Sequence, residues 1–171
     1  YANDFYKLGG KILLEEMLRS SIPIIRIKGC DLIAETVQNN PFSQAAVLDS
    51  PLVTKLTELL DDNSQEENVR VKALYAISCL IRDNPKTPDY FDVKQLSILI
   101  SLLDCRTQTN KLRTKACFLL FSLASSSDQV KEALVNNGLV QKFISILKED
   151  HDSSHEYVAS ALRAIVSEHE E

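Results

Sequence analysis

The sequence contains no tryptophan, and glycine and proline together supply only nine of its 171 residues. Aromatic residues make up just 6% of the chain. Leucine, isoleucine, alanine, lysine and glutamate dominate instead, and these residue types favour α-helix. Since a chain of this length buries roughly 70% of the surface that its unfolded form exposes, the composition predicts one helical domain with a substantial core.

An excess of basic charge and long hydrophobic runs are missing too. Nineteen basic against twenty-four acidic side chains give a net charge of −5, the wrong balance for binding a phosphate backbone. The longest apolar runs, such as Leu96–Leu103, fall well short of the roughly twenty residues of a membrane span. We therefore expect no nucleic acid and no membrane among the partners of this chain. We also expect the chain to be a monomer. Because the sequence begins at Tyr1 and not at methionine, we also expect it to be a fragment of a longer protein.

The cysteines lack the spacing of a metal site. They form no CxxC pair and no Cys/His cluster, so neither a metal nor a cofactor is predicted. We interpret them as reduced thiols of a cytoplasmic protein. The four are Cys30, Cys79, Cys105 and Cys117.

Catalytic patterns are missing as well. His151 and His155 belong to the segment HDSSH, which we interpret as a solvated loop that runs into the start of a helix. The glycines form no phosphate-binding loop, and no serine or cysteine has a base at a recognisable spacing. The sequence therefore gives no argument for an enzyme.

What the chain does contain is a repeated phrase. IRIKGCDLIAETVQNNP at 25–41 is echoed by VRVKALYAISCLIRDNP at 69–85 and by LRTKACFLLFSLA at 112–124. Each copy can be aligned on one small residue, at intervals of 44, 43 and 45 residues. Apolar residues recur four places before and after this anchor, as in a helix, and a period in the low forties is typical of stacked armadillo or HEAT units. The anchors are Gly29, Ala73, Ala116 and Ala161, which we expect to be structural because helices approach within about 8–10 Å only at short side chains.

A middle helix precedes each long one, and a shorter first helix precedes three of these middle helices. The middle helices are predicted at 11–18, 52–60, 95–103 and 139–147, and the shorter first helices at 41–48, 88–93 and 128–135. Three helices per unit favour armadillo over HEAT repeats. The sequence thus predicts an all-α fold, an armadillo-like right-handed α-solenoid of about four three-helix repeats. We expect one domain over residues 1–171, with repeats at about 1–40, 41–84, 85–127 and 128–171.

Prolines and a glycine predict where helices end. Asn40-Pro41 and Asn84-Pro85 are expected to end the long helices, since proline bars its predecessor from helical geometry. Gly138 marks a turn between the first two helices of the last repeat.

The long helix of each repeat leaves one arc that is not apolar, and we expect these arcs to line a concave, partner-binding face. In a projection at about 100° per residue, this arc holds offsets −2, −1, +2, +5, +6 and +9 from the anchor. Its aromatic members, Tyr75, Phe118 and Phe121, resemble a protein-binding hot spot ringed by charge, although such rings also fill gaps between repeats. We expect Asp31 and Glu35 to select basic patches of a partner, and the lysines to steer an acidic one. The predicted partner-binding residues are Lys28, Asp31, Glu35, Gln38, Lys72, Tyr75, Cys79, Arg82, Lys115, Phe118, Phe121, Ser122 and Arg163.

Arginine recurs at offset −3, at Arg26, Arg70 and Arg113. A cation in the first turn of a helix opposes the helix dipole by a few tenths of a kcal/mol, so its repetition needs a cause. The projected position lies inside the packed arc. We therefore predict that each arginine is structural and bonds a carboxylate or carbonyl of a neighbouring repeat.

The phrase RVKALYAISCLIRDNP, with DFYKLGG at 4–10 and KACFLLFSLA at 115–124, resembles the armadillo-type exchange factors of the 70-kDa heat-shock chaperone. These are the cytosolic Hsp70-binding protein family and its Fes- and Sil-type relatives, and the likeness extends to GLVQKFISILKEDHDSSHEYVASAL at 138–162. Phe121 and Ser122 stand where more polar residues are expected, and Gly29 replaces the usual alanine. A Sil-type relative would act in the lumen of the endoplasmic reticulum, whereas the closeness to the cytosolic branch favours the cytoplasm.

The resemblance implies a co-chaperone that embraces one lobe of the chaperone's nucleotide-binding domain and promotes ADP release. The alternative function is that of an armadillo adaptor for extended peptides. Such adaptors resemble one another in using tryptophans and a ladder of regularly spaced asparagines in the groove to hold the peptide backbone. The chain has no tryptophan, and the ladder positions hold Glu35, Cys79, Ser122 and Ser167. A structural scaffold without exchange activity is the third alternative.

Overall fold

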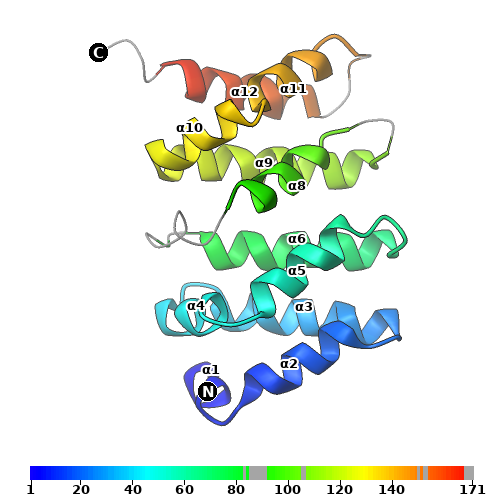
Figure 1. The fold of residues 1–171 in the computed structure, drawn as a ribbon, viewed down its shortest axis with the longest axis vertical. Coiled ribbons are helices and arrows are strands. Elements are labelled where there is room, and N and C mark those ends of the chain that lie inside the picture. The colour runs from blue at the N-terminus through cyan, green and yellow to red at the C-terminus, as the bar shows by residue number, and fades with distance from the viewer. Residues whose placement is uncertain (83, 85–91, 105–106, 150, 152–153, 168–171) are drawn as a thin grey trace. The chain divides into compact units, whose positions relative to one another are not determined.

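Helices account for all the regular secondary structure that the computed structural model assigns to the residues it describes. Those residues are 1–82, 84, 92–104, 107–149, 151 and 154–167. The predicted helix at 88–93 lies almost wholly outside them. Figure 1 shows the helices, which are α1 (Ala2–Lys7), α2 (Gly10–Arg19), α3 (Pro23–Val37), α4 (Pro41–Leu48), α5 (Leu52–Asp61), α6 (Glu67–Ile81), α8 (Val93–Ser101), α9 (Asn110–Ser126), α10 (Asp128–Asn136), α11 (Leu139–Ile146) and α12 (Ser154–Ser167).

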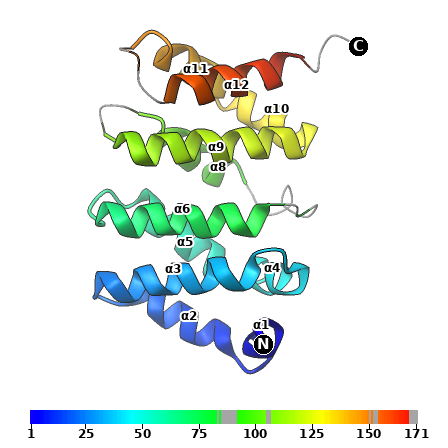
Figure 2. The same ribbon diagram turned by 180° about the vertical axis from the view of Figure 1, so that it is seen from behind.

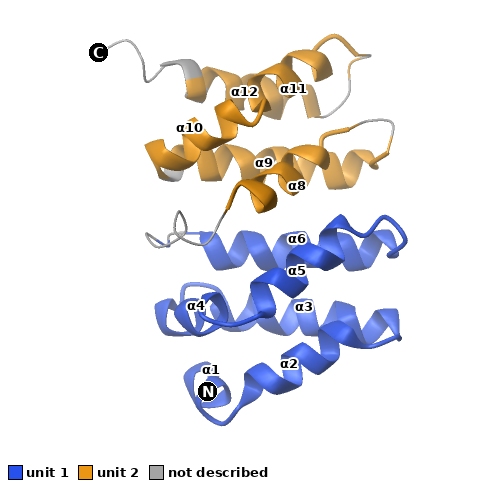
Figure 3. Cartoon of the chain, in the orientation of Figure 1, with its two compact units in different colours: residues 1–84 blue, residues 85–171 orange. Residues whose placement is uncertain are grey.

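The chain divides into two compact units, residues 1–84 and residues 85–171 (Figure 3). The division coincides with the predicted boundary between the second and third repeats. Each unit therefore contains two of the predicted repeats, while the joining of all four into one domain stays a prediction.

In the first unit, the long helices α3 and α6 stack on one another, and α2 and α5 pack against them (Figure 2). The short helices α1 and α4 contact each other. The second unit repeats this plan, since α9 packs on α12 while α8 and α11 lie against those two helices. The long helices match the repeated phrase of the sequence, and the middle helices match the predicted segments to within two residues.

Local sequence explains where several helices begin. Pro41 occupies the first turn of α4, and the Asn40 side chain accepts a hydrogen bond from the Ser43 backbone N–H at 3.2 Å. Gly138 has φ of 85°, and α11 starts directly after it. Asp92 and Gln95 form a reciprocal capping box at the start of α8.

The prediction that Asn40-Pro41 ends the long helix was wrong in its detail. Helix α3 already ends at Val37, and Asn39 takes the left-handed conformation with φ of 52°. Asn40-Pro41 instead opens the next helix, because proline has a fixed φ suited to a first helical turn and needs no donor there. At the corresponding place in the second repeat, α6 ends at Ile81, and the Gln44 side chain donates to the carbonyl of Arg82 at 3.2 Å.

The small anchor residues are all buried in the long helices, and Ala73, Ala116 and Ala161 are fully inaccessible. At Gly29 the absence of a side chain allows two residues of α2 to lie close to the backbone of α3. A Cβ atom placed there would lie 3.0 Å from Met17 Cβ and 3.2 Å from a methyl group of Leu18. The close approach is therefore between α2 and α3 of one repeat, which accounts for glycine at this anchor.

Replacing Ala73 by leucine is expected to lower the free energy of unfolding by about 1–3 kcal/mol, because a fully buried alanine leaves no room for three more carbon atoms. Denaturant titration would measure the change. Ala159→Leu on the exposed side of α12 is the matched control and should leave stability nearly unchanged. Equal stability of the Ala73 variant and the original would show that the repeat alignment is wrong.

The recurring arginines bind carbonyls near helix ends. Arg26 donates to the Ser20 carbonyl at the end of α2, and Arg70 Nε donates to the Leu60 carbonyl in the last turn of α5 at 2.9 Å. The predicted carbonyl acceptors are therefore present, but both belong to the arginine's own repeat and not to a neighbouring one. The guanidinium sits at the carboxyl end of the preceding helix, where the helix dipole favours a cation.

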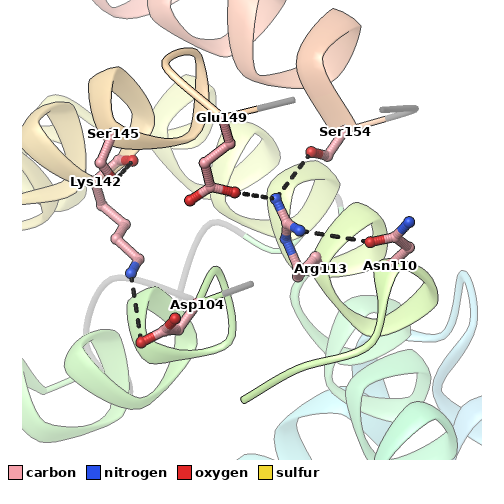
Figure 4. A network of polar contacts seen from close by, with 7 residues as sticks. All are labelled: Asp104, Asn110, Arg113, Lys142, Ser145, Glu149 and Ser154. Atoms are coloured by element: carbon pink, nitrogen blue, oxygen red, sulfur yellow. Dashed lines mark hydrogen bonds and ion pairs between the residues drawn. The ribbon is translucent and has the colours of Figure 1, made fainter. Parts of the chain in front are cut away.

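Arg113 in the second unit does reach the next repeat. Its guanidinium lies 3.4 Å from a Glu149 carboxylate oxygen and donates to the Ser154 hydroxyl at the same distance (Figure 4). Its other terminal nitrogen donates to the Asn110 side chain at 3.4 Å. The Arg113 side chain is only 5% exposed, so these contacts compensate a buried charge.

Candidate partner-binding surface

In the first unit, the predicted surface lies on the long helices α3 and α6. Lys28 and Glu35 are exposed on α3, and Tyr75 is 42% exposed on α6. Gln38 and Arg82 are exposed at the residues that immediately follow α3 and α6. The repeat alignment therefore placed equivalent residues at equivalent places.

Asp31 and Lys72 join the two helices of this surface. The Lys72 ammonium lies 2.6 Å from the Asp31 carboxylate, one repeat away in sequence, and 5.9 Å from the centre of the Tyr75 ring. The hydrogen bond to Asp31 raises the pKa of Lys72, so its charged form is favoured. Asp31 is therefore already paired with a cation of its own chain, a contact that projection along a single helix does not predict.

Cys79 is a correction, because the structure buries this side chain to 4% exposure whereas the projection placed it on the partner-binding face. The Tyr75 phenol, one turn earlier on α6, interacts with the Cys79 thiol, and this interaction raises the pKa of Tyr75. Cys79 thus supports the exposed aromatic side chain and is not itself available to a partner.

In the second unit, the surface lies on α9 and α12. Lys115, Ser122 and Arg163 are exposed, and Phe118 is 51% exposed. Phe121 is only half-buried, so it lies between the predicted surface and the interior. The side chain of Ser167, a ladder position, lies outside what the structure describes.

Tyr157 on α12 is a member of this second surface that sequence reasoning missed. Its ring centre lies 4.3 Å from that of Phe118, with the ring planes tilted by 45°. Its offset of −4 belongs to the packed arc and holds isoleucine, valine and leucine in the other repeats. The change from aliphatic to aromatic was the signal, since a ring at that place is long enough to meet Phe118.

The other candidate chemistries have little support in the described residues. Burial raises the pKa of Cys30 to about 12, so this thiol is protonated and unreactive. No group of three His, Cys, Asp or Glu side chains gathers as metal ligands in the described segments. The structure likewise describes no helix with the length and hydropathy needed to cross a bilayer.

HDSSH does run into the start of a helix, as expected, but the interpretation of a solvated loop was wrong at its last two residues, Ser154 and His155. His155 lies in the first turn of α12, is 8% exposed, and stacks on the His151 ring at 4.9 Å between centres. Because α12 already begins at Ser154, His155 packs with the helix and not with the loop. Residues 152 and 153 lie outside the described part of the chain.

Within residues 1–84 two three-helix repeats stack on one another, which is typical of an armadillo-repeat fold. The designed armadillo repeat protein YIII(Dq)4CqI superposes with a TM-score of 0.78 over 96% of this chain and 68% of that protein, at 18% sequence identity. The chain matches the SIL1/FES1/HPBP1 C-terminal domain over residues 1–108, and it belongs to that family.

Two relatives have names that state what they bind or do. Hsp70-binding protein 1 of Rattus norvegicus is 32% identical over 169 residues, which is 98% of this chain and 46% of that protein. Hsp70 nucleotide exchange factor FES1 of Saccharomyces cerevisiae is 28% identical over 144 residues, 81% of this chain and 49% of that protein. The chain thus spans about half the length of these relatives. They are named for binding and nucleotide exchange and not for catalysis.

Proposed function

We propose that this chain is a co-chaperone that binds the nucleotide-binding domain of a 70-kDa heat-shock chaperone and promotes the release of ADP. Membership of the SIL1/FES1/HPBP1 family carries the proposal, together with the names of the two relatives. The surface of the long helices supports it, because exposed aromatic rings among charges are typical of protein-binding sites.

The mechanism requires a difference in affinity between two states of the partner. The factor must bind an opened nucleotide-binding domain better than a closed one, since a ligand shifts an equilibrium only by its differential affinity. Raising an open state from 1% to 99% takes about 5.5 kcal/mol of that difference. By linkage, ADP must weaken binding of the factor as much as the factor weakens binding of ADP.

Contact surface alone can supply this energy. The chain therefore acts without catalytic side chains, metal or cofactor, and we propose that it works as a cytoplasmic monomer. Its net charge of −5 argues against nucleic acid as a partner. Reduced, buried cysteines at positions 30, 79 and 117 agree with a cytoplasmic location.

Release of fluorescent ADP from the purified chaperone tests the proposal. We expect the 171-residue chain at saturating concentration to speed dissociation by at least tenfold, and excess ADP to weaken its binding. Unchanged dissociation with a folded chain would refute exchange activity. Titration with a basic peptide in parallel tests the adaptor alternative, and a chain that binds neither partner would be left as a scaffold.

A further inference from the structure

The Asp31–Lys72 ion pair joins the two long helices on the exposed surface of the first unit. It links α3 to α6 across one repeat at 2.6 Å, and the Lys72 side chain is still 40% exposed, against 21% for Asp31. An ammonium group has three N–H donors. Asp31 accepts one hydrogen bond from this group, which leaves donors on the solvent side.

Lys72 also lies beside the exposed ring of Tyr75. The distance of 5.9 Å from ammonium to ring centre is within the range of a cation–π interaction. The carboxylate on one side and the ring on the other thus hold a flexible side chain in one place. A cation held in position loses less entropy when a partner binds.

We infer that Asp31 is a positioning residue, which holds Lys72 beside Tyr75 so that Lys72 receives an acidic side chain of the partner protein. This rests on the proposed function and specifies the chemistry of one contact. It reverses the expectation that Asp31 selects basic patches. A basic side chain arriving here would meet the Lys72 ammonium first and would have to displace it from a 2.6 Å ion pair.

The surrounding charges favour an acidic group at this point. Lys28 is exposed one turn before Asp31 on α3, and Arg82 is near enough to Tyr75 to act electrostatically on its phenol. Glu35 is the exposed acid further along α3. An incoming carboxylate beside Tyr75 would therefore accept a hydrogen bond from a second N–H of the Lys72 ammonium, which Asp31 already orients.

Exchange of the two charges separates positioning from simple stabilisation. The double variant Asp31→Lys with Lys72→Asp can form the same ion pair, so its melting temperature should stay within a few degrees of the original. It nevertheless presents a carboxylate beside Tyr75. We expect it to bind the isolated nucleotide-binding domain about tenfold or more weakly, as estimated for one lost charge-assisted contact.

Three single variants complete the test. Lys72→Met should weaken binding by about tenfold, whereas Lys72→Arg keeps the cation and should restore most of the affinity. Lys55→Met is the matched control, because Lys55 forms an ion pair of the same 2.6 Å length with Glu58 within the middle helix α5 and does not belong to the long helices. It should bind as the original chain does.

The outcomes are distinguishable. If the original chain binds but the charge-exchanged variant binds within twofold of it, the pair is only structural and the inference fails. If the charge-exchanged variant does not fold, equal binding by Lys72→Met and the original chain overturns the inference. If the original chain itself shows no binding, the proposed function fails first.

Discussion

Replacing Tyr75 by alanine is expected to weaken binding to the chaperone's nucleotide-binding domain by about 30-fold, corresponding to the roughly 2 kcal/mol of an aromatic hot spot. Tyr75 is 42% exposed in the unbound chain, so a partner still has a large apolar surface to cover. The ring also packs beside the Lys72 ammonium, and its loss removes one support of that cation. Isothermal titration calorimetry with the isolated domain would measure the change.

Phe42 on α4 provides a closely matched control. It is 44% exposed, and the Lys7 ammonium lies 5.5 Å from its ring centre, so its exposure and cationic neighbour resemble those of Tyr75. It belongs to a first helix and not to the surface of the long helices. Phe42→Ala should leave affinity within twofold of the original. Equal losses from both variants would show that binding does not depend on the predicted surface.

Periodicity carried most of the fold prediction. A helix was predicted at 41–48, and α4 spans the same residues because proline and apolar spacing act within one turn. The small anchors could be predicted because helices that pack closely leave room only for glycine or alanine at the contact. Such a residue therefore recurs at a nearly constant interval along the sequence. What periodicity did not provide was the identity of the facing helix, which for Gly29 is α2 of the same repeat.

The candidate surface was predictable as an arc but not as a set of contacts. Projection along one helix placed Cys79 on the surface, yet Tyr75 interacts with its thiol and the side chain is buried. Asp31 and Lys72 were both placed on the surface, but their ion pair joins helices 41 residues apart in sequence. Helical projection describes each helix alone, and such contacts depend on how two helices meet.

Replacing Phe143 by alanine is expected to give the largest loss of stability, about 3–5 kcal/mol in the free energy of unfolding. Phe143 is the largest of the fully buried side chains described, with 0% exposure, and it lies on α11 in the second unit. Truncation removes an aromatic ring and leaves a cavity that surrounding helices can fill only in part. Urea titration followed by circular dichroism would measure it.

The adjacent residue supplies the control, since Ile144 on the same helix is 44% exposed. Ile144→Ala should change stability by less than about 1 kcal/mol because its side chain is already partly solvated.

The pair also tests the prediction of a single domain. In one cooperative domain, Phe143→Ala moves the whole transition to lower urea. If residues 1–84 unfold independently, the variant instead splits the curve, and only the step belonging to residues 85–171 moves. A Phe143→Ala curve that overlays the original would contradict the packing of α11 itself.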